Sequence, residues 1–144
     1  MPLPRLLSLV NAQAYRAHFE SRYVYGPPVV THDGIRVRFI PSDFDHAFYC
    51  KSHRAAPRKN TFDLERARRV DWIHTLLADS SLEMFRDPRH PNKMRRVVLE
   101  PTTPYVIVIE LLRKDWSRAR FITAFVVDDD WGSLIRIRRM PRWR

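Results

Sequence analysis

Cysteine is nearly absent from this sequence and long apolar runs are missing, and each absence excludes a class of protein. The one cysteine, Cys50, excludes an internal disulfide and every zinc motif built from several cysteines. No apolar run reaches the length of a membrane span, and the opening MPLPRLLSLVNAQAY lacks the cleavage pattern of a signal peptide. We therefore expect a cytoplasmic protein with no membrane partner.

Acidic residues are scarce. The chain has 16 Asp and Glu against 26 Lys and Arg, which gives a formal net charge of +10. Most of these cations are arginines, whose planar guanidinium groups match phosphate geometry. A polyanion is the natural partner, and the histidines and aromatic residues among the charges favour RNA or DNA over a membrane surface. A basic surface that serves only solubility is the alternative.

The pattern of apolar residues predicts helices first and strands afterwards. Apolar spacing and capping residues predict helices over 3–22, from Ser42 or Asp43 onward, and from Asn60 or Thr61 to about Ala78. The Asp-Gly pair at 33–34 predicts a hairpin between the first two helices. Strand-like runs follow at 95–100, 105–112, 120–128 and 134–138.

These elements predict an α+β fold. The 144 residues fit a single domain, 1–144, and no internal repeat divides it. Short connections between the strand-like runs predict an antiparallel meander, and 105–112, which is apolar on both faces, should be its central strand. We expect N-terminal helices and a small hairpin followed by a four-stranded antiparallel meander, with the helices packed on one face.

Arg66 falls on the apolar stripe of the helix predicted over 61–78. At the helical turn angle, Arg66 lies among the apolar residues within about 80° of Phe62, and Arg69 lies at their edge; these apolar residues are Val70, Ile73, Leu76 and Leu77. Burying an unpaired arginine costs several kcal/mol. Arg66 therefore reaches out to solvent, pairs with a buried acid, or points into a cleft.

The segment 43–60 contains two histidines and the cysteine among several cations. On a helix from Ser42, His46, Cys50 and His53 share one face, but the two histidines are about 10 Å apart along the axis. That is too far for one metal ion, so we expect no metal site and no cofactor. His46 lies at the border of the apolar face, where a histidine satisfied by its neighbours is the plainer alternative to an acid–base role.

Thr123 places a hydroxyl on an apolar strand face. In the strand predicted over 120–128, it shares a face with Phe121, Phe125 and Val127. Threonine is a good strand former, so a purely structural role is the alternative.

Taken together and in this order, these segments are similar to a known family. HAFY at 46–49, ERARRVDWI at 65–73 and FITAF at 121–125 resemble the phage-associated branch of the barnase–EndoU–colicin–RelE (BECR) nuclease superfamily. The resemblance covers about residues 35–128. It implies a small α+β protein that acts as a metal-independent endoribonuclease, of the toxin or mobile-element type.

The resemblance also implies roles for particular residues. The active-site histidine falls on His46, the helix arginine on Arg66 and the strand hydroxyl on Thr123. The second basic group has no unique match, and Lys59, Arg69 and Arg113 compete for it. Together with His53, these three residues are the predicted RNA-binding residues. In such enzymes the 2′-hydroxyl of RNA attacks the adjacent phosphorus and leaves a 2′,3′-cyclic phosphate. An acidic immunity or antitoxin protein is an expected partner.

Two other classes of function remain open from the sequence. A non-catalytic basic module that binds RNA or DNA, or that inhibits a nuclease, explains the charge equally well but leaves Arg66 and Thr123 without a role. A metal-dependent nuclease needs converging acids. The acidic cluster at 128–130 lies in a predicted turn, where Asp is ordinary.

Overall fold

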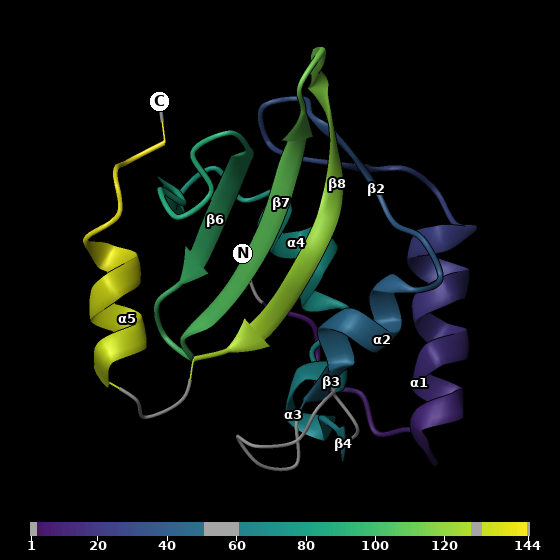
Figure 1. The fold of residues 1–144 in the computed structure, drawn as a ribbon. Helices are drawn as coiled ribbons and strands as arrows, with labels where there is room; N and C mark the ends of the chain where they lie inside the picture. The colour runs from purple at the N-terminus through teal and green to yellow at the C-terminus, as the bar shows by residue number, and fades with distance from the viewer. Residues whose placement is uncertain (1–2, 51–60, 128–130, 144) are drawn as a thin grey trace.

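The structure is a computed structural model that describes residues 3–50, 61–127 and 131–143, and it has an α+β architecture (Figure 1). The helical segments are α1 (Ala12–Phe19), the π-helical segment η1 (Glu20–Val24), α2 (Asp43–Phe48), α3 (Leu64–Ala67), α4 (Trp72–Leu77) and α5 (Trp131–Arg138). The strands are β1 (Val29–Val30), β2 (Arg36–Arg38), β3 (Tyr49–Cys50), β4 (Thr61–Phe62), β5 (Glu83–Arg86), β6 (Met94–Glu100), β7 (Tyr105–Leu112) and β8 (Asp115–Val126). Among the described residues, no helix combines the length and apolarity needed to cross a membrane.

The main sheet has six strands in the order β1-β2-β8-β7-β6-β5, and β3 pairs with β4 separately. Neighbouring strands are antiparallel except β2 and β8, which are parallel. The strands predicted over 95–100, 105–112 and 120–128 are present as β6, β7 and β8, and β7 is an interior strand as predicted. The Asp-Gly hairpin is confirmed by the pairing of β1 with β2, and Gly34 takes a φ of 88° in its turn.

The segment 134–138, predicted as the fourth strand of the meander, belongs to helix α5 instead. Its sequence alternates like a strand, but Leu134, Ile137 and Met140 recur at helical spacing and pack with Phe85 of the sheet. This cluster is separate from the larger core under α1, α2 and α4. The helices therefore pack on both faces of the sheet, and the prediction of helices on one face is wrong.

The helix predicted over 61–78 is interrupted. Its start is strand β4, and helix α3 begins only after Asp63, whose carboxylate accepts a hydrogen bond from a backbone N–H of the first turn. The helix breaks again before α4. There the Arg69 guanidinium donates to the Glu65 carbonyl at 2.6 Å, the acceptor that the Arg69 N–H would use in a continuous helix.

The first helix is also shorter than predicted. Residues 3–10 are not helical, and α1 begins after Asn11, whose side chain caps it. The preceding segment is bonded to other elements: the Leu7 N–H donates to a carbonyl at the end of α3 at 2.9 Å, and the Trp72 indole donates to the Pro4 carbonyl at 2.8 Å. Backbone groups with partners elsewhere do not close a helical turn.

One arginine is buried within the fold. Arg96 on β6 is 2% exposed and donates two hydrogen bonds to the Asp33 carboxylate, at 2.9 and 2.6 Å. The bonds from Arg96 hold the pKa of Asp33 well below its ordinary value. The pair ties β6 to the turn between β1 and β2.

Replacing Asp33 by Asn should lower the free energy of unfolding by about 2 to 3 kcal/mol, because the buried Arg96 charge loses its counter-ion. The pKa of Asp33 is lowered in the folded state, so this stabilisation is present above the ordinary pKa of Asp and is lost as the pH falls through the folded value. Urea denaturation at neutral pH and in strong acid checks both points, and the difference should shrink in acid. Asp115→Asn, at the exposed start of β8, should cost much less stability, and equal losses in the two variants would contradict the prediction.

Candidate active site on the open sheet face

Four charged residues form a line across the sheet, which we call the arginine row: Arg38 on β2, Arg120 on β8, Glu110 on β7 and Arg95 on β6. Each is the direct cross-strand partner of the next. Directly opposed residues point to the same side of a sheet. Their strand neighbours Val37, Ala119 and Ile109 are buried in the core that the helices α1, α2 and α4 share. The arginine row therefore lies on the opposite face, part of which is covered by α5, and we call the remainder the open sheet face.

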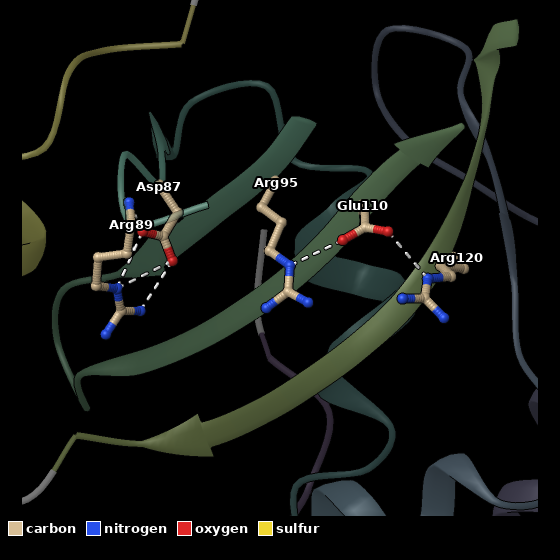
Figure 2. Close-up of polar contacts among 5 residues, drawn as sticks. All are labelled: Asp87, Arg89, Arg95, Glu110 and Arg120. Carbon is tan, nitrogen blue, oxygen red and sulfur yellow. Dashed lines mark hydrogen bonds and ion pairs between the residues drawn. The ribbon is translucent and has the colours of Figure 1, made fainter. Parts of the chain in front are cut away.

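Glu110 is held between two guanidinium groups (Figure 2). Arg95 Nε donates to one carboxylate oxygen at 2.9 Å, and Arg120 Nε donates to the other at 3.2 Å. Because both arginines use Nε, their terminal nitrogens point away from the carboxylate. The side chains of Arg95 and Glu110 are 17% and 15% exposed, whereas Arg120 is 53% exposed. The pair of arginines thus keeps donors available for an incoming anion.

The Glu110 carboxyl is ionised at neutral pH. Burial acts to raise its pKa, but the hydrogen bond from Arg95 and the charges of both arginines outweigh burial, and the pKa of Glu110 lies below its ordinary value. The arginine row combines three arginines with this one carboxylate, so its net charge is positive. Such a line of guanidinium groups suits the phosphates of a nucleic acid.

A second ion pair lies beside Arg95, on the far side from Glu110 (Figure 2). The Asp87 N–H donates to the Arg95 carbonyl at 3.1 Å. The Asp87 carboxylate, only 3% exposed, accepts from Arg89 at 3.0 and 2.8 Å. These bonds from Arg89 lower the pKa of Asp87. A buried acid therefore orients an arginine that is 55% exposed, next to the arginine row.

Two pairs of arginines face each other where β2 joins β8. Arg36 lies opposite Arg118, and Arg38 lies opposite Arg120. Like charges directly opposite each other destabilise a sheet. The same four arginines, together with Asp43, line a cavity of about 450 Å³, which we call the arginine cavity. An anion in this cavity would relieve the repulsion, so the pairing indicates a place for phosphate.

A bulge in β8 turns Thr123 toward the arginine row. The pairing with β7 shifts, so that Ile109 pairs with Phe121 but Val108 pairs with Thr123, leaving Ile122 as the extra residue. Phe121 therefore belongs to the helix-side core, whereas Thr123 faces the other way with Val108. The prediction that Thr123 and Phe121 share a face is wrong. Because of the bulge, Thr123 lies on the open face, after Arg120 along β8.

His46 lies at the flank of the arginine row. It is exposed on α2, which packs against β8, and β2 pairs with β8 only at 118–120. Asp43, in the same helix, is buried, and burial raises the pKa of its carboxyl. The Ile40 N–H and the charges of His46 and Arg120 act in the opposite direction on Asp43. The histidine and the arginine row therefore both lie near this one carboxylate.

Arg66 is paired and partly buried. Its Nε lies 3.1 Å from the Asp63 carboxylate, and a terminal nitrogen donates to the Ala47 carbonyl at 3.2 Å. Its guanidinium lies 5.5 Å from the centre of the Phe125 ring, a cation–π contact. Among the alternatives that the sequence left open, an acid partner for Arg66 is present, although Asp63 is itself 24% exposed. These contacts connect the end of α2 to the end of β8.

The structure brings His46, Arg66 and Thr123 to neighbouring elements around the last part of β8, but it separates Arg69 from them. Arg69 is 13% exposed, is bonded to Glu65, and lies over the Trp72 ring on the helical side. Its contact with RNA stays a prediction. Arg113 is exposed in the turn between β7 and β8. The predicted RNA-binding residues His53 and Lys59 lie outside the described residues.

The sequence contained a signal for Glu110 that helix and motif spacing did not reveal. Glu110 is the one charged residue in the strand YVIVIELL. A carboxylate in an otherwise apolar interior strand needs a partner or a function. Its partners Arg95 and Arg120 are on the adjacent predicted strands, so a search for charged residues within the strands would have singled out Glu110 and candidate partners for it, although not the register that aligns them.

Comparison with protein-family models, with curated proteins and with solved structures finds no match for this chain. The resemblance to the BECR superfamily therefore stays a prediction, and function has to be argued from the site. Within the described ranges, no three His, Cys, Asp or Glu side chains gather in a way that would hold a metal ion.

Proposed function

We propose that this protein is a metal-independent endoribonuclease that binds RNA on the open sheet face and cleaves it at the arginine row. The observation that carries the proposal is Glu110, an ionised carboxylate held between Arg95 and Arg120 on a face with surplus positive charge. A proton acceptor beside two guanidinium groups is what phosphate chemistry at an RNA 2′-hydroxyl requires.

In the proposed reaction, Glu110 accepts the proton of the 2′-hydroxyl. The 2′-oxygen forms a bond to the adjacent phosphorus, and the bond from phosphorus to the 5′-oxygen breaks. The departing oxygen takes a proton from His46, the exposed histidine of α2. The products are a 2′,3′-cyclic phosphate and a free 5′-hydroxyl, so the reaction needs no added water and no oxidant.

The arginines would stabilise the pentavalent phosphorus state. Negative charge grows on its equatorial oxygens, and the terminal nitrogens of Arg95 and Arg120 are free of the Glu110 carboxylate to meet it. Thr123, next on the same face, would donate a further hydrogen bond. Arg66 would bind a neighbouring phosphate at the end of β8.

The arginine cavity would hold the RNA backbone beside the reacting phosphate. Its arginines are positioned on paired strands, so little backbone order has to be gained on binding. An acidic immunity or antitoxin protein would cover the same surface, and its association should be fast and sensitive to salt.

Purified protein in excess EDTA should cleave RNA and leave DNA of the same sequence intact, because the proposed nucleophile is the 2′-hydroxyl. Electrophoresis of end-labelled substrates measures cleavage, and mass spectrometry of the fragments should show cyclic phosphate ends. Tight binding of transfer, ribosomal and messenger RNA without cleavage would overturn the proposal and favour the non-catalytic binding module. Cleavage that EDTA abolishes would instead favour the metal-dependent nuclease.

A further inference from the structure

A separate cavity lies between the β1–β2 turn, the β7–β8 hairpin and the C-terminal residues. Its volume is about 770 Å³, within the usual range for small-ligand sites. The lining residues that matter here are Asp33, Arg86, Arg96, Trp116, Arg142 and Trp143. We call it the tryptophan cavity.

The buried side of the tryptophan cavity is Arg96. Two of its nitrogens are bonded to Asp33, yet Nε is buried and has no hydrogen-bond partner among the described residues. Its guanidinium also lies 4.6 Å from the Trp143 ring centre. A buried donor without a partner is costly. An acceptor group entering this cavity is one way to satisfy it.

The wall formed by the C-terminal residues is fixed to the sheet. The Arg86 N–H donates to the Pro141 carbonyl at 2.8 Å, and the Trp143 N–H donates to the Met84 carbonyl at 2.9 Å. These bonds place Trp143 along the edge strand β5. The aromatic ring is therefore held in position before any ligand binds, which reduces the entropy cost of binding.

The open side of the tryptophan cavity combines an aromatic ring with positive charge. Trp116 is 57% exposed, which is unusual for so large an apolar side chain. Arg86 is exposed. Arg142 is 63% exposed, but its guanidinium lies over the Phe85 ring and 3.9 Å from the Glu83 carboxylate, on the other face of the sheet, so Arg86 is the cation on the side of the cavity. Asp33, which is 38% exposed, adds carboxylate oxygens as acceptors. These groups suit a ligand that is flat and aromatic at one end and anionic at the other.

We propose that the tryptophan cavity binds a single nucleotide, with its base against Trp116 and Trp143 and its phosphate on Arg86. Nucleobases stack on aromatic side chains and on guanidinium planes. Asp33 accepts a hydrogen bond from an exocyclic amino group of the base, as carboxylates do with cytosine. The Arg96 Nε donates to a ring nitrogen or carbonyl of the base.

The nucleotide has two sources, a free mononucleotide or an unpaired residue of a single-stranded RNA. The second source rests on the proposed endoribonuclease function, and it would select single-stranded RNA as the substrate class. The cavity lies away from the arginine row, because Arg96 and Ile109 point to the side of the sheet opposite Glu110. Binding there is measurable without cleavage.

The test compares two ligands and three variants. Calorimetry with adenosine, guanosine, cytidine and uridine monophosphates measures the first source, and fluorescence anisotropy with labelled single-stranded pentanucleotides measures the second. The pentanucleotides carry 2′-O-methyl groups, so they cannot be cleaved by 2′-hydroxyl attack. Trp116→Ala should weaken binding about tenfold or more, the scale of losing one base–aromatic stack. Trp116→Phe should restore most of the affinity, and Tyr25→Ala, which removes an aromatic ring that is 74% exposed elsewhere, should not change it.

The outcomes distinguish a free nucleotide from a residue of RNA, and they test the tryptophan cavity separately from the endoribonuclease function. If the affinity for mononucleotides depends on Trp116, the ligand is a free nucleotide. If only the affinity for pentanucleotides depends on Trp116, the ligand is an unpaired residue of RNA. Equal affinity of Trp116→Ala and the original protein for both ligands, or no binding of either ligand, overturns the tryptophan cavity proposal. If the protein did not cleave RNA, these binding results would be unchanged.

Discussion

Replacing Glu110 by Gln should reduce RNA cleavage by roughly a hundredfold or more, the usual contribution of a positioned proton acceptor. Glutamine keeps the size of the side chain and one oxygen that accepts from either Arg95 or Arg120, but its NH2 group cannot accept from the other arginine, and it cannot take the proton of the 2′-hydroxyl. It also removes a negative charge from the arginine row, so affinity for RNA should stay the same or rise. Single-turnover cleavage in EDTA gives the rate, and anisotropy with the uncleavable RNA gives the affinity.

Glu65 supplies the matched control for this prediction. Like Glu110, it lies between two arginines, at 3.2 Å from Arg68 and 3.0 Å from Arg69, but on helix α3. Glu65→Gln should therefore cleave RNA at the original rate. If Glu110→Gln cleaves as fast as Glu65→Gln does, the arginine row is not the catalytic centre, and a role in binding alone would remain for it.

The elements that the sequence predicted correctly are those whose structure is determined by residues within the element itself. The strand at 105–112 has apolar residues on both faces, which only an interior strand accommodates, and the Asp-Gly turn needs the freedom of Gly34. Local spacing predicted the wrong element where the apolar pattern fits both the strand period and the helix period. LIRIR in 134–138 alternates like a strand, yet its helical partner Met140 lies beyond the segment, and contacts with the sheet decide the outcome.

The site was harder to predict because pairing register creates it. Arg38, Arg95, Glu110 and Arg120 are far apart in the chain, and only the order and register of four strands align them. The bulge at Ile122 is likewise a property of the pairing, and it moves Thr123 to the other face. A one-residue shift of register exchanges the faces of every later side chain. Spacing within a single strand does not contain that information.

His46→Ala should abolish measurable cleavage, because no proton donor would remain for the departing 5′-oxygen at neutral pH. RNA affinity should hardly change, since one histidine adds little to binding set by many cations. Single-turnover rates, with affinities measured on the uncleavable RNA, check both points.

His32 is the control for the histidine prediction. It too is exposed, but its backbone N–H is bonded to the Leu77 carbonyl at 2.9 Å and its ring lies beside Met84, near the β1–β2 turn. His32→Ala should keep both the cleavage rate and the affinity for RNA. If His46→Ala behaves the same way while Glu110→Gln is inactive, the arginine row catalyses the reaction with another donor, and His46 is only a border residue of α2. If both His46→Ala and Glu110→Gln remain fully active, the reaction takes place elsewhere on the chain, because the proposed mechanism has no proton transfer that bypasses both groups.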